Sequence, residues 1–214
     1  MITIESIQIG KVVTEGDPNA RDAISRQWTS AFRKTHVVGA VSINELGIVG
    51  DQVADTKNHG GPEKAILCYA GVHYRSWADE HPELDFLAGG FGENLTLGGV
   101  TESDVCIGDR FRSGECVLEV SQPRQPCWKI ARRWRTKSMT KEVTQTGRTG
   151  WYVRVITGGS LTSGSELELI SRPNADWTIA RANDVLYGRE VDRMAVHTLM
   201  HLPELSREWQ DALA

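Results

Sequence analysis

Long apolar segments are missing from this 214-residue chain, which has no run of about 18 apolar residues that could span a membrane. Residues 1–11 also lack the basic start and apolar core of a signal peptide. The sequence therefore predicts a cytoplasmic protein without a membrane anchor. Cysteines are few, four in all, and none forms a CxxC pair. This spacing argues against zinc sites and iron–sulfur clusters of the CxxC type, and in a reducing cytosol the thiols should be free.

Several common catalytic motifs are absent as well. Neither a P-loop nor a G-x-G-x-x-G sequence occurs, so ordinary nucleotide cofactors have no signature here. The segment His59-Gly60-Gly61 is similar to the HGGG segment of esterases, but no G-x-S-x-G elbow accompanies it. His197 and His201 are spaced for one helical face, yet no Glu follows His197, which excludes an H-E-x-x-H zinc motif.

Acidic residues are scarce in one segment only. The whole chain carries a net charge of −4, which argues against a nucleic-acid-binding role for the protein as a whole. Between Arg124 and Arg148, however, there are eight Lys or Arg residues and a single acid, Glu142. Three interpretations stay open for this basic stretch: a solvated helix face, an anion-binding site, and nucleic-acid binding by residues 129–141.

The pattern of the chain indicates a turn-rich β protein, because 21 glycines, several of them in pairs, separate short apolar runs. Such chains form barrels or sandwiches. We expect helices at residues 72–80 and 128–145 and strands at residues 2–9, 37–43, 65–69, 116–121, 151–156 and 166–170. Pro123 and Pro126 should end the strand that precedes them, since proline has no backbone N–H to donate.

A change of pattern follows a linker at residues 172–175. Three short helices should come next, the first capped by Thr178, the second by Asp192, and the third with Pro203 in its first turn. Such a tail buries little core by itself, so we expect it to dock on the barrel or on a second subunit of a homodimer. The predicted domains are therefore residues 1–172 and 173–214.

Cys127 is the cysteine whose neighbours point to chemistry. The other three lie in apolar strand patterns that are typical of buried, inert thiols. Cys127 follows Pro126 and precedes Trp128 and Lys129, with Arg124 close by, so it lies in a stiffened segment beside cations. Nearby cations favour the thiolate, which is a nucleophile or a soft metal ligand. A half-buried structural cysteine is the competing interpretation.

A cysteine nucleophile needs a base, and His59 is the candidate, because Gly60 and Gly61 leave its ring accessible. A cysteine hydrolase is therefore one hypothesis, and a turn histidine bonded to the backbone is the alternative. Glu93 and Asn94 lie in a Gly-rich loop, where structural turn bonds explain such residues well.

Several segments, taken together and in order, resemble the MOSC domain family (the molybdenum cofactor sulfurase C-terminal domain), in its YiiM-like branch. The matching segments are residues 47–55, 59–65, 92–95, 107–109, 122–129 and 150–155, and the tail at 180–213 is similar to the three-helix extension of that branch. Two residues depart from the family pattern, which usually has Asp in both places. Glu63 is a mild departure, and Ser165 weakens only a turn.

The resemblance implies a mainly β fold, a MOSC-type β-barrel with peripheral helices and a small C-terminal three-helix domain. It also implies a molybdenum–pyranopterin cofactor (the molybdenum cofactor), with Cys127 as the ligand of molybdenum. Basic residues would hold the phosphate of the cofactor, and two further matches lie in the Gly-rich loops. The complete set of implied cofactor-binding residues is Lys34, His59, Lys64, Asn94, Arg124 and Arg154.

Members of this branch are linked to the reduction of N-hydroxylated compounds, including hydroxylaminopurines. The resemblance therefore implies an oxidoreductase for small N-hydroxylated substrates such as 6-N-hydroxylaminopurine, with a role in hydroxylaminopurine detoxification. The chain has no flavin, haem or cluster signature, so the electrons would come from an external reductase. A non-catalytic carrier or sensor of the same cofactor is the alternative function.

Overall fold

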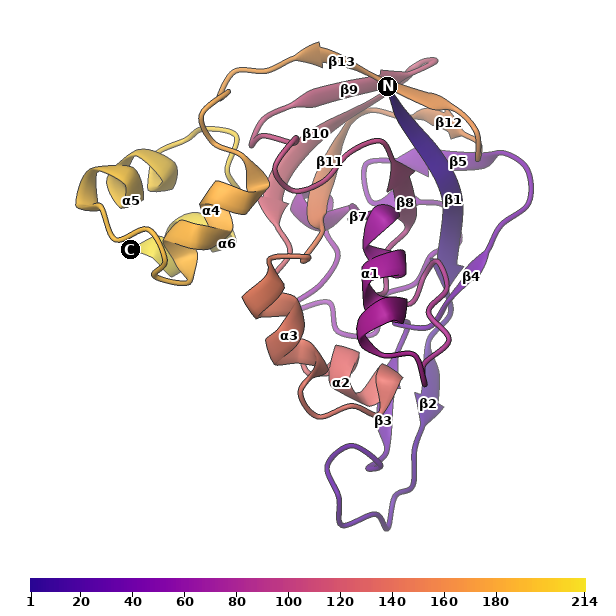
Figure 1. Cartoon of the computed structure of the whole chain (residues 1–214). Helices are drawn as coiled ribbons and strands as arrows, with labels where there is room; N and C mark the ends of the chain where they lie inside the picture. Colours follow the sequence, from indigo (N-terminus) through magenta and orange to yellow (C-terminus); the bar gives the residue numbers. More distant parts are fainter.

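Seven strands close into a barrel in the computed structural model, which describes residues 1–214 (Figure 1). Each strand is hydrogen-bonded to the next and the last returns to the first, in the order β1 (Ile2–Gly10), β13 (Glu166–Ser171), β9 (Arg110–Ser113), β10 (Cys116–Pro123), β11 (Trp151–Thr157), β7 (Ile66–Ala70) and β8 (Leu95–Gly98). All neighbours are antiparallel except β7 and β8, between which the chain forms helix α1 (Val72–Glu80). The mainly β fold class is confirmed.

Shorter elements extend the barrel. Strand β4 (Lys34–His36) pairs with the end of β1. A small sheet combines β5 (Val41–Asn44), β6 (Gly47–Ile48) and β12 (Gly159–Leu161). Figure 1 shows the hairpin of β2 (Val13–Glu15) and β3 (Trp28–Ser30) projecting away from the barrel, and a 3₁₀ helix, η1 (Pro62–Lys64), precedes β7.

The broken alternation of the first strand has a structural cause. Ile4 and Ile7 are both fully buried, although they are three positions apart on one strand, where alternation would put them on opposite faces. The register between β1 and β8 shifts between Ile4 and Ser6, which is the mark of a β-bulge. The bulge turns Ile7 back toward the barrel interior.

The expected strand at residues 37–43 was wrong. The chain forms β4 and β5 instead, and between them Val38 is 89% exposed and Gly39 has a φ of +90°. A positive φ interrupts the extended backbone, and glycine adopts it without steric cost. The apolar run therefore covers two strands of different sheets.

Two boundaries near Cys127 also differ from expectation. Strand β10 continues through Pro123. Its pairing with β9 ends at Glu119, so the missing N–H of the proline breaks no hydrogen bond on that edge of the strand. The helix expected at 128–145 is two helices, α2 (Lys129–Trp134) and α3 (Met139–Thr146). Arg135 separates them with a left-handed φ of 52°, a conformation that is uncommon for arginine and therefore not expected from the sequence.

The C-terminal tail consists of helices α4 (Ile179–Leu186), α5 (Arg193–Met200) and α6 (Arg207–Leu213), which lie together beside the barrel in Figure 1. The caps Thr178 and Asp192 are confirmed, since each side chain accepts a backbone N–H of its helix. The predicted start of the third helix at Pro203 was wrong, because α6 begins later and is capped by Ser206. None of the helices is long and apolar enough to cross a membrane.

The tail and the barrel share one apolar core of 30 buried residues, to which the tail contributes Leu199 and Trp209 among others. The backbone N–H of Ser206 also donates to Ser121 on β10 at 2.9 Å. The tail thus docks on the barrel of its own chain, one of the two expected arrangements, while a homodimer and the domain boundary at residue 172 stay predictions. A second core cluster of 10 buried residues, rich in aromatic rings, joins α1, α2 and α3.

Candidate functional site

A cavity of about 500 Å³ opens beside the barrel. Its walls come from the β3–β4 segment, the long loop at residues 46–64, and the segment that links β10 to α2. Six of the seven residues singled out from the sequence line it: Lys34, His59, Lys64, Asn94, Arg124 and Cys127. The fold therefore brings together residues that are spread over nearly a hundred positions of the chain.

Cys127 is the one cysteine that is not buried. Burial raises the pKa of the Cys68 and Cys106 thiols, and it raises the pKa of Cys116 to about 11. These three thiols are therefore protonated and shielded from reagents. Only Cys127 offers its sulfur to the cavity, which agrees with the distinction drawn from the sequence.

The backbone around Cys127 is fixed by two helices. Its carbonyl accepts the N–H of Ile130 at 3.1 Å, in the first turn of α2. The same oxygen accepts the hydroxyl of Thr140 on α3 at 3.2 Å. The thiol therefore stands at a defined place on the cavity wall, as a ligand or nucleophile requires.

The walls of the cavity carry more positive than negative charge. Four cationic side chains line it, against the two carboxylates of Asp51 and Asp55. The cations are Lys34, Lys64, Arg124 and Lys129. Away from bulk water these charges act at low effective dielectric, so the excess of cations suits an anionic ligand such as a phosphate group.

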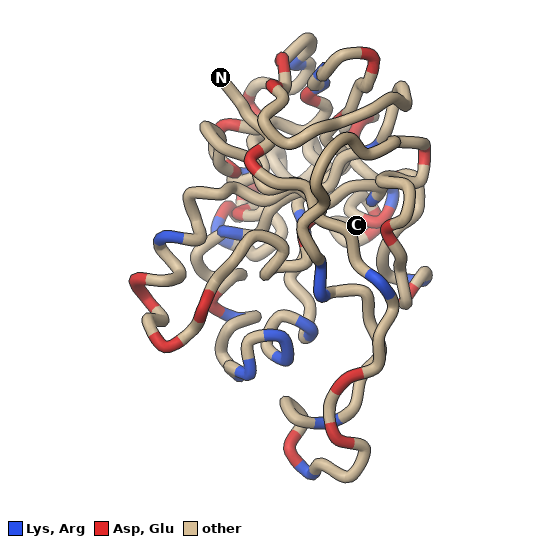
Figure 2. The backbone as a smooth tube through the Cα atoms, turned by 90° about the vertical axis from the view of Figure 1, so that its right-hand side faces the viewer, with Lys and Arg blue, Asp and Glu red and all other residues tan.

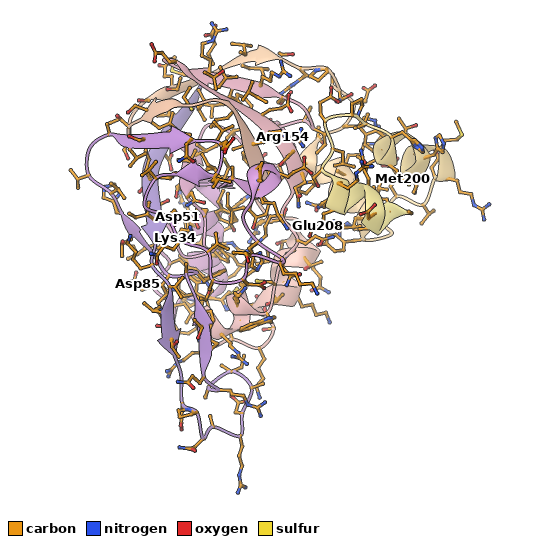
Figure 3. All side chains as sticks on the ribbon, turned by 180° about the vertical axis from the view of Figure 1, so that it is seen from behind. Lys34, Asp51, Asp85, Arg154, Met200 and Glu208 are labelled. Carbon is orange, nitrogen blue, oxygen red and sulfur yellow. The ribbon has the colours of Figure 1, made fainter.

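Lys34 is a buried cation held by Asp51, and Figure 3 shows the two side by side. Its Nζ lies 2.7 Å from both carboxylate oxygens. Burial lowers the pKa of Lys34, and the charge of Asp51 opposes this shift. Asn94 donates to Asp51 at 2.9 Å and accepts the N–H of Leu67 at 3.1 Å. Asn94 thereby positions Asp51, and its own amide has little capacity left for a ligand.

Arg124 is almost fully buried, with 3% of its surface exposed. Its guanidinium donates to the carbonyl of Phe91 at 3.0 Å, and its backbone N–H continues the pairing of β10 by donating to Gly150. No carboxylate neutralises it in an ion pair. A buried guanidinium without a counter-ion is a strong attractor for an anion in the cavity.

The C-terminal tail reaches the cavity through one ion pair. The Nζ of Lys64 donates to the carbonyl of Asn58 at 2.6 Å and to the carboxylate of Glu208 on α6, which faces the barrel in Figure 3. The neighbouring Glu63 accepts the N–H of Arg207 at 2.8 Å. The tail therefore helps to hold one of the cavity cations.

Glycines shape the rim of the cavity. Gly61 has a φ of +81°, and a Cβ placed on it would meet nothing within 4 Å, so its backbone is open to a ligand. Gly92 has the same φ, and a Cβ there would lie 2.9 Å from the ring of Phe32. Side chains at either position would be strained by the positive φ. The missing side chain lets a flat molecule approach the backbone at Gly61, whereas at Gly92 it makes room for the ring of Phe32.

The lining residues that were not singled out from the sequence include Asp51, Lys129 and Tyr152. Asp51 and Tyr152 lie within the segments that resemble the family, so closer attention to those segments would have found them. Lys129 also lies in such a segment, 122–129, and in the basic stretch whose interpretation was left open. In the structure its side chain is only 6% exposed and lies 3.8 Å from Asp55.

The ring of His59 is neutral at pH 7, because burial and the charge of Lys129 lower its pKa to about 4. We expect its NMR titration to have a midpoint near 4, and Lys129→Met to raise that midpoint. An unfolded histidine titrates near 6.5, so the unfolded chain takes up this proton first, and the contribution of His59 to stability falls as pH is lowered from about 6.5 toward 4. A midpoint near 6.5 in both proteins would contradict the assignment.

This low basicity disfavours the cysteine hydrolase hypothesis. A cysteine nucleophile is activated when a neighbouring histidine holds its proton as an imidazolium. A ring that protonates only near pH 4 is a poor acceptor for that proton. A role for Cys127 as a metal ligand needs no such base.

The structure does not bring Arg154 to the cavity. Its guanidinium donates to Glu119 at 2.8 Å and to Glu63 at 2.7 Å. Glu119 lies directly across from it on β10 and also pairs with Arg110 at 2.7 Å. Arg154 therefore serves an ion-pair network on the barrel wall.

Arg154→Met should lower the free energy of unfolding by about 1–3 kcal/mol, because the buried carboxylate of Glu119 loses one of its two charged partners. Denaturant unfolding measures this, with Arg112→Met on the exposed side of β9 as a control of little effect. Unchanged stability of Arg154→Met would contradict this role and would favour the cofactor-binding role that the resemblance implies.

Comparison with known proteins agrees with the fold. The model of the MOSC domain matches residues 55–168, and the model of the YiiM-like 3-alpha helix domain matches residues 177–214. The protein YiiM of Escherichia coli is 40% identical over 182 residues, 84% of this chain and 81% of that protein. A protein of Gibberella moniliformis named "Reductase" is 35% identical over 86% of this chain, but only 33% of its own length is covered.

Solved structures show the same arrangement. The crystal structure of YiiM from Geobacillus stearothermophilus has a TM-score of 0.81 and 33% sequence identity, with all of both chains covered. The barrel and the three-helix tail are thus shared over the full length. The chain belongs to the MOSC domain family, in the group that carries the YiiM-like three-helix domain.

Proposed function

We propose that this protein binds a molybdenum–pyranopterin cofactor in the cavity, with Cys127 as the ligand of molybdenum, and reduces small N-hydroxylated compounds. The observation that carries the proposal is the accessible thiol of Cys127 in a cavity lined by four cations. A purine such as 6-N-hydroxylaminopurine is the substrate class that we propose.

The donor set fits this cofactor better than a bare metal ion. No group of three or more His, Cys, Asp or Glu side chains in the chain could hold a metal by itself. A metal at Cys127 must therefore bring most of its own ligands, as molybdenum bound to a pterin dithiolene does. The phosphate of the pterin would find Arg124, Lys64 and Lys34 among the cavity cations.

The bound cofactor would supply a two-electron centre that accepts the oxygen of the substrate. The balance is one N-hydroxylated amine plus two protons and two electrons, giving the amine and water. The residues of the chain supply the surroundings of the cofactor. The backbone at Gly61 is open to a flat molecule, and the neutral ring of His59 adds no further charge. Lys129 adds a buried cation near Cys127.

The electrons must come from another protein or domain, since nothing in the chain resembles a flavin, haem or cluster site. The relative named "Reductase" supports this view, because about two thirds of its length lies outside the matched region. The part outside the match is long enough for an additional domain, such as one that supplies electrons.

The proposal is tested with protein produced in a host that makes the cofactor. Metal-loaded protein is incubated with 6-N-hydroxylaminopurine and a reduced viologen dye, and adenine is measured. We expect steady formation of adenine, and none above background with Cys127→Ala. Protein that holds molybdenum and pterin but forms no adenine would instead be a carrier or sensor of the cofactor. Protein that holds neither would contradict both functions.

A further inference from the structure

The basic stretch divides into two parts with different surroundings. Arg124 and Lys129 line the cavity. The cations that follow lie on or next to α2 and α3, outside the cavity. Glu142, the single acid of the stretch, contacts the imidazole of His81 at 2.6 Å. In Figure 2 a group of Lys and Arg positions without acidic ones between them lies beside the projecting hairpin. The proposed function gives these outer cations no role.

Trp128 is the residue that directly precedes α2. Its side chain is 51% exposed, which is unusual for the largest apolar residue type. Arg132 stacks on the ring at 4.4 Å, and the ring of Trp28 meets it edge-on at 5.7 Å. The guanidinium of Arg132 also donates to the carbonyl of Arg26 in the hairpin at 3.2 Å. Trp128 is therefore held in a fixed pose with part of its surface open to solvent.

Arg135 is held at this surface against a steric preference. It is the only residue other than glycine with a positive φ, 52°, and it ends α2 where glycine is the usual choice. A non-glycine residue in this conformation is strained, because its Cβ crowds the following carbonyl oxygen. Its exposed side chain makes no ion pair, and neither does that of Lys141 on α3. The chain thus keeps unpaired cations here at some expense in stability.

We propose that the surface formed by Trp128, Arg132, Arg135 and Lys141 is the docking site for an acidic electron-carrier protein. This inference rests on the proposed function, which needs an external electron donor. Electron-transfer complexes use small, charged interfaces in which complementary charge speeds the encounter, and Trp and Arg are common at the centres of interfaces. Trp128 follows Cys127 directly in the chain. A carrier protein bound at Trp128 would therefore lie one residue from the proposed molybdenum ligand.

The first test measures binding of flavodoxin, an acidic electron carrier, to the full-length chain. We expect the double variant R135E/K141E to bind about tenfold more weakly, and the affinity of the original protein to fall as salt is added. The matched control R112E/R193E reverses two exposed cations on β9 and α5 and should bind as the original does. Equal binding by both variants would overturn the proposal, as would binding of duplex DNA in place of flavodoxin.

The second test separates docking from the reaction itself. With cofactor-loaded protein, R135E/K141E should reduce 6-N-hydroxylaminopurine normally with reduced viologen, but about tenfold more slowly when flavodoxin and its NADPH-dependent reductase supply the electrons. An equal loss with both donors would overturn the docking role. If the original protein is inactive with viologen, the proposed function fails, while the binding measurement still decides whether the surface docks the carrier.

Arg135→Gly provides a third measurement with a distinct signature. Glycine relieves the left-handed backbone, so the variant should unfold at the same or a higher temperature and yet bind flavodoxin more weakly. A lower unfolding temperature with unchanged binding would show that the arginine serves the fold, and would overturn its place in the docking surface.

Discussion

Replacing Cys127 with serine should remove bound molybdenum, from nearly one metal per chain to the background of the measurement. Serine keeps the size of the side chain but replaces a soft thiolate with a hard hydroxyl, a poor ligand for this metal. The protein should remain folded, because the Cys127 side chain belongs to neither core cluster. Metal analysis of protein purified from a cofactor-producing host gives the result directly.

The matched control is Cys116→Ser, which removes a buried thiol in the barrel core. Burial keeps that thiol protonated, so it has no part in metal binding, although the polar replacement lowers stability. The folded fraction of Cys116→Ser should carry as much molybdenum as the original protein. Stoichiometric molybdenum in Cys127→Ser would show that another group is the ligand.

Removing the charge of Arg124 should weaken retention of the cofactor by about 10- to 100-fold, because a buried, charge-assisted bond to phosphate contributes about 1.5–3 kcal/mol. Arg124→Met keeps most of the side-chain volume and deletes the charge. Pterin and molybdenum content after extensive dialysis, with a thermal melt to verify folding, measure the loss.

Lys137→Met is the control for this second prediction. Lys137 belongs to the same basic stretch, but it is 77% exposed and pairs with Asp22 of the hairpin at 3.2 Å. Its loss should leave cofactor content unchanged. If Lys137→Met loses cofactor and Arg124→Met keeps it, the division of the basic stretch into a cavity part and a docking part is wrong.

The residues around Cys127 were predictable from the sequence because their signals are local. Pro123 and Pro126 stiffen the segment before Cys127, and the neighbouring cations are visible in the chain itself. Asp192 and Thr178 were recognised as caps for the same reason, since capping depends on a residue and the few that follow it. The order of the family segments then related distant residues such as Lys64 to the same site.

Arg154 shows what the sequence could not specify. Its partner Glu119 is 35 positions away, and the two meet only because β10 and β11 pair in one particular register. Nothing local distinguishes an arginine that faces a cavity from one that faces a carboxylate on the next strand. The end of helix α2 at Arg135 was not predicted for a related reason. The backbone there is left-handed without a glycine, so the sequence gives no sign of a helix end.

Alkylation of cysteine tests most directly whether Cys127 holds the cofactor. Cofactor-free and cofactor-loaded protein are treated with iodoacetamide under native conditions, and the modified peptides are identified by mass spectrometry. The structure predicts that Cys127 alone reacts in the cofactor-free protein, since the other three thiols are buried. In the loaded protein we expect Cys127 to be protected, because its sulfur is bound to molybdenum. Equal modification of Cys127 in both forms would contradict it.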